Sequence, residues 1–212
     1  YELPLDEKIP VLAVLRQRPV LIGMLLIGCF ASMPSNLVGI LLPLQLKDGM
    51  GEAGATIYGY LNSLNGFVVI SCTPILTILL KKLTEIPKSI LGLLLFVAGI
   101  CFFSVGAAVS LLFIGMFVFT LGEVITVLGH NPYNSRRIPA SHRGRIGGIS
   151  TVVYSIFSSL TQYMISLILI LSRSNYQLIW TVFICCGLVS AVMYGFMYIP
   201  DRKTFPKLYE KK

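Results

Sequence analysis

The sequence predicts an all-α membrane protein with six transmembrane helices. Of its 212 residues 55% are hydrophobic and only 12% are charged, and the mean hydropathy is +0.81, which lies outside the range of soluble globular domains. Six apolar stretches approach or exceed the roughly 20 residues that a helix needs to cross the hydrocarbon core. None alternates with the period of two typical of barrel strands, and open strands would leave backbone groups unpaired in lipid.

The limits of these stretches give the predicted spans. Between Ser89 and Leu128 the only charged residue is Glu123, and 40 residues of continuous helix would be ~60 Å long, about twice the bilayer core. The chain is therefore expected to turn back at 104–109, around Gly106. The spans are predicted at about 19–46, 56–80, 89–104, 109–128, 146–171 and 178–199.

Basic residues in the connecting segments predict the orientation. In membrane proteins Lys and Arg accumulate in short cytoplasmic loops. Only Lys47 and Arg173 fall on one side; the other 15 of the 17 basic residues fall on the other side, namely Lys8, Arg16, Arg18, Lys81, Lys82, Lys88, Arg136, Arg137, Arg143, Arg145, Arg202, Lys203, Lys207, Lys211 and Lys212. Both chain ends are thus predicted to be cytoplasmic, in a multi-pass protein of the plasma (inner) membrane.

This orientation explains the net charge of +8 as a topology signal and an attraction to anionic lipids, so no nucleic-acid partner is expected. The expected organisation is a cytoplasmic linker with an amphipathic segment (1–18), a six-helix transmembrane domain (19–200) and a basic cytoplasmic tail (201–212). The first residue is Tyr1 and the opening segment is polar, which suggests a piece of a longer polypeptide.

Metal and enzyme sites are not predicted. The five cysteines lie inside spans without metal-ligand spacing, and neither an HExxH motif nor a second deep carboxylate accompanies Glu123. We expect no cofactor, no metal and no catalytic residue.

Polar side chains at mid-membrane depth occur in four of the six spans. They are Asn36 in the first, Asn62 and Asn65 in the second, Glu123 in the fourth and Gln162 in the fifth. Small polar residues such as Ser32 and Ser158 recur at helical spacing on the same faces. Such stripes either line a polar cavity or bring helices close together, and the sequence leaves both open.

Glu123 is the strongest candidate for function. An ionised side chain near the bilayer centre costs roughly 2.5–3.5 kcal/mol on insertion scales, so such residues usually face a bundle interior or a watery cavity and serve ions, protons or ligands. The alternative is a neutral carboxyl held only for packing. Thr120 lies one turn before it; His130 follows two turns later at the membrane exit, where an interfacial role is favoured.

Two segments resemble a known family. The run TLGEVITVLGHNPYNSRRIPASHRGRIGGIS, Thr120 to Ser150, resembles the tenth span, the following basic loop and the start of the eleventh span of major facilitator superfamily transporters, most like bacterial drug:proton antiporters. The run YGYLNSLNGFVVISCTPILTILLKKL, from Tyr58 to Leu83, resembles the eighth span. The resemblance implies that the chain is the C-terminal half of a twelve-span transporter, spans seven to twelve, with an N-terminal six-helix half as its partner.

The same resemblance implies a function and roles for residues. In that family spans seven, eight, ten and eleven line the cavity, which are the four spans with deep polar groups here, and spans nine and twelve are peripheral. The implied activity is proton-coupled efflux of small amphipathic or lipophilic compounds, with Glu123 binding proton and substrate in turn. The cavity would be formed by Ser32, Asn36, Asn62, Asn65, Phe119, Thr120, Tyr154, Ser158 and Gln162.

Four arginines would form a cytoplasmic gate against the other half: Arg136, Arg137, Arg143 and Arg145. Their simpler role would be topology anchoring. Further aromatic residues are expected in interfacial belts, namely Tyr58, Tyr60, Tyr176, Trp180, Tyr194 and Tyr198.

Two other functions stay open. The adjacent Gly122 and Glu123 also resemble a Gly-Glu pair in the tenth span of proton-coupled oligopeptide transporters, although Leu128 and Gly129 stand where a Pro commonly follows there. A proton-coupled importer of peptides or other small solutes is therefore one alternative. A non-transporting six-span sensor or subunit is the other, because one half alone cannot perform alternating access.

Overall fold

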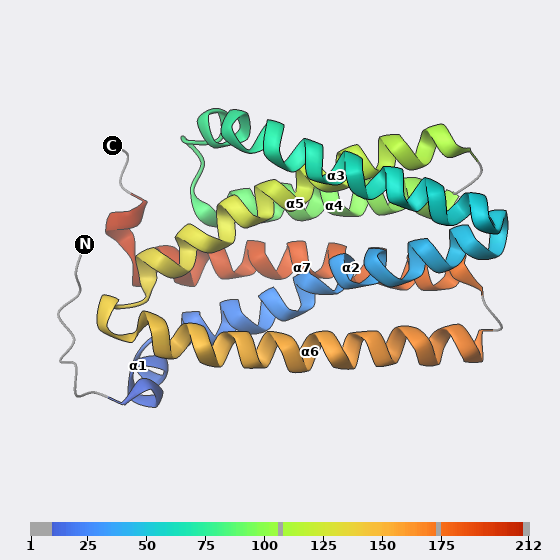
Figure 1. Cartoon of the computed structure of the whole chain (residues 1–212). Helices are drawn as coiled ribbons and strands as arrows, with labels where there is room; N and C mark the ends of the chain where they lie inside the picture. The colour runs from blue at the N-terminus through green and yellow to red at the C-terminus, as the bar shows by residue number, and fades with distance from the viewer. Residues whose placement is uncertain (1–9, 106–107, 173–174, 210–212) are drawn as a thin grey trace.

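Six long helices run the length of a single bundle in the computed structural model, which describes residues 10–105, 108–172 and 175–209 (Figure 1). The described part contains no strand, and six helical segments are long and apolar enough to cross a membrane. The all-α prediction and the six spans are confirmed. The elements are α1 (Val11–Gln17), α2 (Pro19–Met50), α3 (Glu52–Leu79), α4 (Glu85–Val105), α5 (Val109–Arg137), η1 (Ala140–His142), α6 (Arg143–Leu171), α7 (Tyr176–Thr204) and η2 (Pro206–Leu208).

Most helices extend beyond the apolar stretches that predicted them. The fourth span was expected to end near Leu128, but α5 continues through Pro132 to Arg137. A helix satisfies its own backbone groups, so it can continue into the polar interface without cost in unpaired donors. The predicted turn between the third and fourth spans lies between the end of α4 at Val105 and the start of α5 at Val109; Gly106 itself lies outside the described residues.

The closest helix pair is α4 and α5, because glycines let their backbones approach. A Cβ added at Gly122 would lie 2.5 Å from the Phe96 nitrogen, and one at Gly99 would lie 2.6 Å from the Phe119 Cβ. Small residues at such contacts are the usual means of tight packing in membranes, where lipid tails compete for apolar surface. The α4–α5 pair is therefore the most tightly packed part of the bundle.

The remaining helices pack around α2 and α5. On one face α3 contacts both of them; on the other, α4 contacts α5 and α7, and α7 contacts α2. Helix α6 packs mainly on α2 along one edge (Figure 1). Only 11% of the apolar window is buried in α3 and in α6, against 44% in α2, α4 and α5. These two helices therefore keep large faces uncovered.

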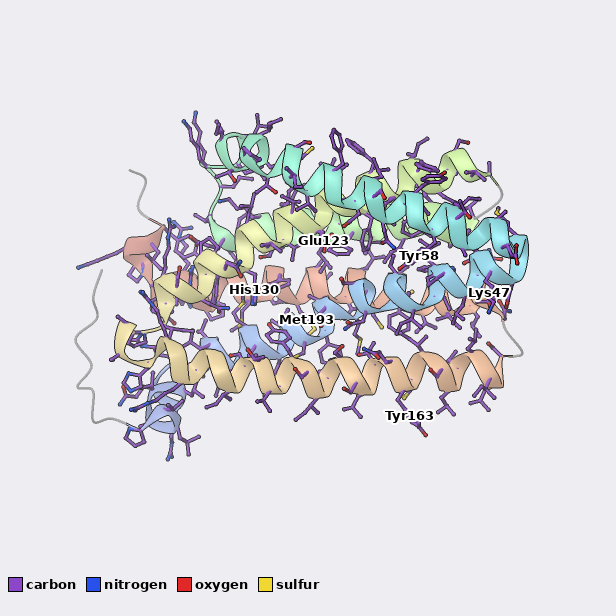
Figure 2. All side chains as sticks on the ribbon, in the orientation of Figure 1. Lys47, Tyr58, Glu123, His130, Tyr163 and Met193 are labelled. Carbon is purple, nitrogen blue, oxygen red and sulfur yellow. The ribbon has the colours of Figure 1, made fainter. Side chains whose placement is uncertain are left out.

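Basic residues gather at one end of the bundle, which we call the basic end. Both described chain ends, the α3–α4 connection and the α5–α6 turn lie there (Figure 1). Among the described basic residues only Lys47, in the last turn of α2, lies at the opposite end (Figure 2). Lys8, Arg173, Lys211 and Lys212 lie outside the described residues.

Two of the aromatics expected in interfacial belts are instead core residues. Trp180 is fully buried, donates from its indole nitrogen to Gln45 Oε1 at 2.6 Å, and packs beside Phe103 with ring centroids 6.0 Å apart. Tyr194 is 2% exposed. Both lie on the α7 face that packs against α2 and α4, which composition alone does not reveal.

Candidate functional site

The carboxylate of Glu123 is held by a polar cluster between α3 and α5. The Asn65 amide nitrogen on α3 donates to Glu123 Oε2 at 3.0 Å and to Thr120 Oγ1 at 2.9 Å. The Thr120 hydroxyl, fully buried, donates in turn to the Met116 carbonyl at 2.7 Å. We call Asn65, Thr120 and Glu123 the α3–α5 polar cluster.

Local helix geometry brings these groups together. Thr120 and Glu123 are three residues apart on α5 and so share a face, and Asn65 approaches that face from α3, which packs on α5. Glu123 is the middle residue of the 29-residue helix, and Figure 2 shows it about halfway along the bundle. The acid thus lies where an ionised group is most costly.

No cation neutralises Glu123 within the described part of the chain, where the ion pairs involve other acids. One carboxylate oxygen accepts from Asn65; the other accepts no hydrogen bond from a described residue. The side chain is only partly buried. A carboxylate with one fixed and one available oxygen can accept a proton or bind a cationic group.

A second polar cluster joins α2 and α6. The Ser158 hydroxyl donates to Asn36 Oδ1 at 3.1 Å, and the Gln162 amide donates to Ser158 Oγ at 3.4 Å. Ser158 and Gln162 are one helical turn apart, and Gln162 is exposed. We call these three residues the α2–α6 polar cluster; it contains donors and acceptors but no charge.

The other predicted cavity residues lie apart from the two clusters. Asn62 is exposed on α3, and Ser32 donates to the Cys29 carbonyl of its own helix at 2.7 Å. The Tyr154 hydroxyl is buried against Gly28 and has no hydrogen-bond partner among the described residues. Its ring lies edge-on to His130, with centroids 6.0 Å apart.

Phe119 requires a correction. It was expected on the cavity wall, but it is 5% exposed and packs edge-on against Phe96 on α4, with ring centroids 4.3 Å apart. Gly99 leaves the space that this approach needs. We therefore assign Phe119 to the α4–α5 core.

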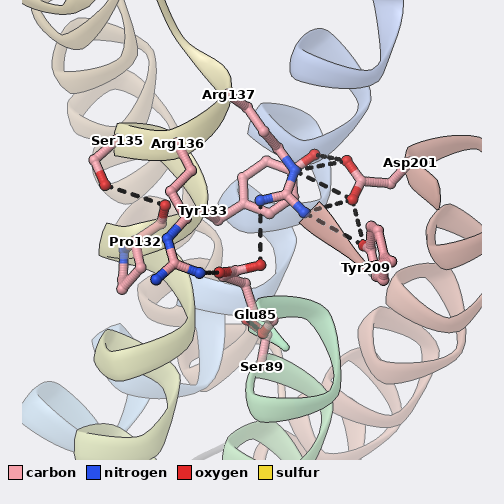
Figure 3. A network of polar contacts seen from close by, with 9 residues as sticks. All are labelled: Glu85, Ser89, Pro132, Tyr133, Ser135, Arg136, Arg137, Asp201 and Tyr209. Atoms are coloured by element: carbon pink, nitrogen blue, oxygen red, sulfur yellow. Dashed lines mark hydrogen bonds and ion pairs between the residues drawn. The ribbon is translucent and has the colours of Figure 1, made fainter. Parts of the chain in front are cut away.

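A buried ion network ties three helices together at the basic end (Figure 3). The Arg137 guanidinium on α5 is fully buried and binds Asp201 of α7, with Nη2 to Oδ2 at 2.6 Å and Nε to Oδ1 at 2.8 Å. Its Nη1 lies 3.3 Å from Oε2 of Glu85 on α4, and Oε1 of the same acid pairs with Arg136 at 2.5 Å. We call these four residues the Arg137 network.

Tyrosines complete the network. The Tyr133 hydroxyl donates to Asp201 Oδ1 at 2.7 Å, and the Arg137 guanidinium carbon lies 3.9 Å from the centre of the Tyr133 ring. The Tyr209 hydroxyl also bonds Asp201. Burial raises the pKa of Tyr209, and the hydrogen bond to Asp201 raises it further, so this hydroxyl stays protonated as a donor at neutral pH.

The four arginines predicted to form a gate thus have different environments. Arg137 is committed to acids of its own bundle, and Arg136 is shared between Glu85 and solvent. Arg143 donates to the Ile138 carbonyl at 3.2 Å, whereas Arg145 is exposed. Arg137 has no exposed surface in this structure, so it has no direct contact to offer another half here; the gate itself stays a prediction.

Sequence reasoning missed Glu85 and Asp201. Glu85 precedes the third apolar stretch and Asp201 follows the sixth, and both lie near lysines and arginines. Their charges therefore could not be distinguished from the usual charged residues of the membrane interface. One signal could have identified Asp201: it is an acid that directly follows Pro200 at the end of a span. Orientation in the membrane depends on Lys and Arg, so an acid at this position suggests another role.

A sequence model described as Major Facilitator Superfamily matches residues 2–162, which span α1 to α5 and much of α6. No curated protein matches the chain at a significant level, and no solved structure does so.

Proposed function

Because the chain belongs to the major facilitator superfamily, a family of secondary transporters, we propose that it forms the C-terminal six-helix half of such a transporter. The whole protein exports small amphipathic or lipophilic compounds in exchange for protons. The observation that carries the proposal is the α3–α5 polar cluster. It presents an acid that has no counter-cation among the described residues and lies about halfway along the bundle.

The uncovered faces of α3 and α6 support the assignment as a half. Only 11% of the apolar window of each is buried, although both helices contain amides and hydroxyls that lipid does not satisfy. In the proposed whole protein an N-terminal six-helix half covers these faces, and the substrate site lies between the halves near the midplane. The two halves then rock about that site in alternating access.

Coupling follows from competition at Glu123. When ionised, the carboxylate attracts a cationic group of the substrate, because charge is poorly screened in a low-dielectric site. When protonated, it loses that attraction and releases the substrate. The Asn65 amide fixes one oxygen at 3.0 Å, so proton and substrate compete for the same carboxylate in a defined position.

The α2–α6 polar cluster supplies neutral recognition in this proposal. Asn36, Ser158 and Gln162 offer hydrogen-bond donors and acceptors without charge. Such groups orient a substrate without selecting one chemical class. An acid on one side and amides on the other fit amphipathic cations better than anions.

The basic end is cytoplasmic in the proposed orientation, as the excess of Lys and Arg favours. The membrane is the plasma (inner) membrane. Substrate would enter from the cytoplasmic leaflet or the cytosol and leave at the opposite end, near Lys47.

The test is transport by the full-length protein in sealed vesicles with an imposed pH gradient. A panel of lipophilic cations is offered to wild type, Glu123→Gln and Glu52→Gln. The control residue is an exposed acid in the first turn of α3, so it undergoes the same chemical change outside the site. We expect proton-driven transport in wild type and Glu52→Gln, and its loss in Glu123→Gln.

Two results would contradict the proposal. Unchanged coupled transport by Glu123→Gln would remove Glu123 from the coupling step. Absence of transport of every compound by wild type would favour a non-transporting sensor or subunit.

A further inference from the structure

A cavity at the basic end of α7 lies outside the site described above. It has a volume of about 600 Å³ and is open to the surroundings. Its walls come from the last turns of α7 and from η2. The lining residues are Tyr198, Ile199, Arg202, Lys203, Pro206 and Tyr209.

The two basic residues of this cavity have no acidic partner among the described residues. Arg202 and Lys203 are exposed, and neither takes part in an ion pair. The nearby acid Asp201 is fully buried and paired with Arg137. Among the described residues, the positive charge of Arg202 and Lys203 is therefore not compensated by an acid.

One wall of the cavity is aromatic. The rings of Tyr198 and Tyr209 meet edge to face, with centroids 5.4 Å apart at 88°. The Tyr209 hydroxyl is held by Asp201, which fixes the pair. The Tyr198 hydroxyl has no hydrogen bond to a described residue and can donate to a ligand.

An apolar stripe leads from the cavity along α7 into the predicted membrane. Val192, Phe196 and Ile199 follow one another at helical spacing and are 57%, 73% and 59% exposed. Residues four and three apart share a face of a helix, so the stripe continues directly to Lys203. A soluble phosphate compound has no apolar chain that could contact this stripe.

The geometry points to a binding site for an anionic phospholipid. The phosphate of the head group binds Arg202 and Lys203, the glycerol region lies against the tyrosine pair, and an acyl chain follows the stripe of Val192, Phe196 and Ile199. Cations near a membrane surface attract acidic lipids, and Arg and Lys are the side chains that most often donate hydrogen bonds to phosphate. The site is independent of Glu123 and of the transport reaction.

The test counts retained lipids. The full-length protein is placed in nanodiscs of phosphatidylcholine with a minor fraction of phosphatidylglycerol, extracted, and analysed by native mass spectrometry. The variant is Arg202→Gln/Lys203→Gln; the matched control is Lys81→Gln/Lys82→Gln, an exposed basic pair of the α3–α4 connection at the same end. We expect retention of phosphatidylglycerol to fall about tenfold in the variant and to stay near the wild-type level in the control.

Equal loss in both double variants would show a general charge effect and overturn the proposal, as would no loss in the first. A further arm adds inorganic phosphate in large excess. Displacement of the lipid by phosphate would reduce the site to a simple anion site, whereas persistence of the lipid supports the role of the apolar stripe. A Phe196→Ser variant, which keeps both cations, should lower retention as well; unchanged retention there would contradict the acyl-chain part of the site.

Discussion

The Arg137 network predicts a large and specific loss of stability when Asp201 is changed to Asn. The substitution keeps the shape of the side chain but removes the charge that binds the guanidinium at 2.6 and 2.8 Å. Arg137 has no exposed surface, so water cannot replace the lost partner. Glu85 remains, but at 3.3 Å it makes the longer contact.

Breaking a buried ion pair in this way costs about 3–5 kcal/mol. For a chain of this size about 1 kcal/mol corresponds to about 2–4 °C in melting temperature, so Asp201→Asn should melt about 10 °C below wild type. The assay is thermal unfolding of the detergent-solubilised protein, monitored as the fraction of protein that stays monodisperse at each temperature. Glu52→Gln makes the same acid-to-amide change at an exposed position and should have the same melting temperature as wild type.

A second variant separates charge from packing. Arg137→Met/Asp201→Asn removes both charges, and the Asn oxygen can still accept from the Tyr133 hydroxyl that binds Asp201. Neutralising both members of a buried ion pair often restores stability. It should melt above Asp201→Asn. The reasoning is refuted if Asp201→Asn melts within about 2 °C of wild type, or if the double variant melts no higher than the single one.

Two other predictions concern the bundle and its central site. Gly122→Ala should lower the stability by about 1–3 kcal/mol, because the new Cβ would meet backbone atoms of α4 at 2.5 Å. The control Gly59→Ala adds a Cβ that meets nothing within 4 Å and should be neutral in the same melting assay. Equal effects of the two substitutions would contradict the tight α4–α5 contact. Asn65→Leu removes the amide that holds the central carboxylate, and a lost hydrogen bond to a charged group should slow transport about tenfold or more. Ser63→Ala removes a hydroxyl that bonds only its own helix; a matching loss in this control would show that the effect is not specific to the cluster.

The spans and the central polar residues could be predicted from the sequence because their signals are local. An apolar stretch of helix length identifies a span by itself. A carboxylate or amide inside such a stretch stands out against its neighbours, and Asn65 and Glu123 do meet in the structure. Each residue could be recognised without knowing its partner.

The Arg137 network could not be predicted because it depends on the register of three helix ends. Arg137 closes α5, Glu85 opens α4 and Asp201 lies near the end of α7. A charged residue at a helix end is the rule in membrane proteins, so each of the three looked ordinary alone. Phe119 was misplaced for a related reason: a small residue on the neighbouring helix, Gly99, admits its side chain.

The central claim is that proton and substrate compete for Glu123, and substrate-induced proton release measures this competition most directly. Purified full-length protein is equilibrated in weakly buffered detergent solution below neutral pH, a transported lipophilic cation is added, and released protons are detected with a pH indicator. Linkage requires that a substrate which binds only the ionised carboxylate expels its proton. We predict release from wild type and Glu52→Gln and none from Glu123→Gln; undiminished release from a substrate-binding Glu123→Gln variant would contradict the claim.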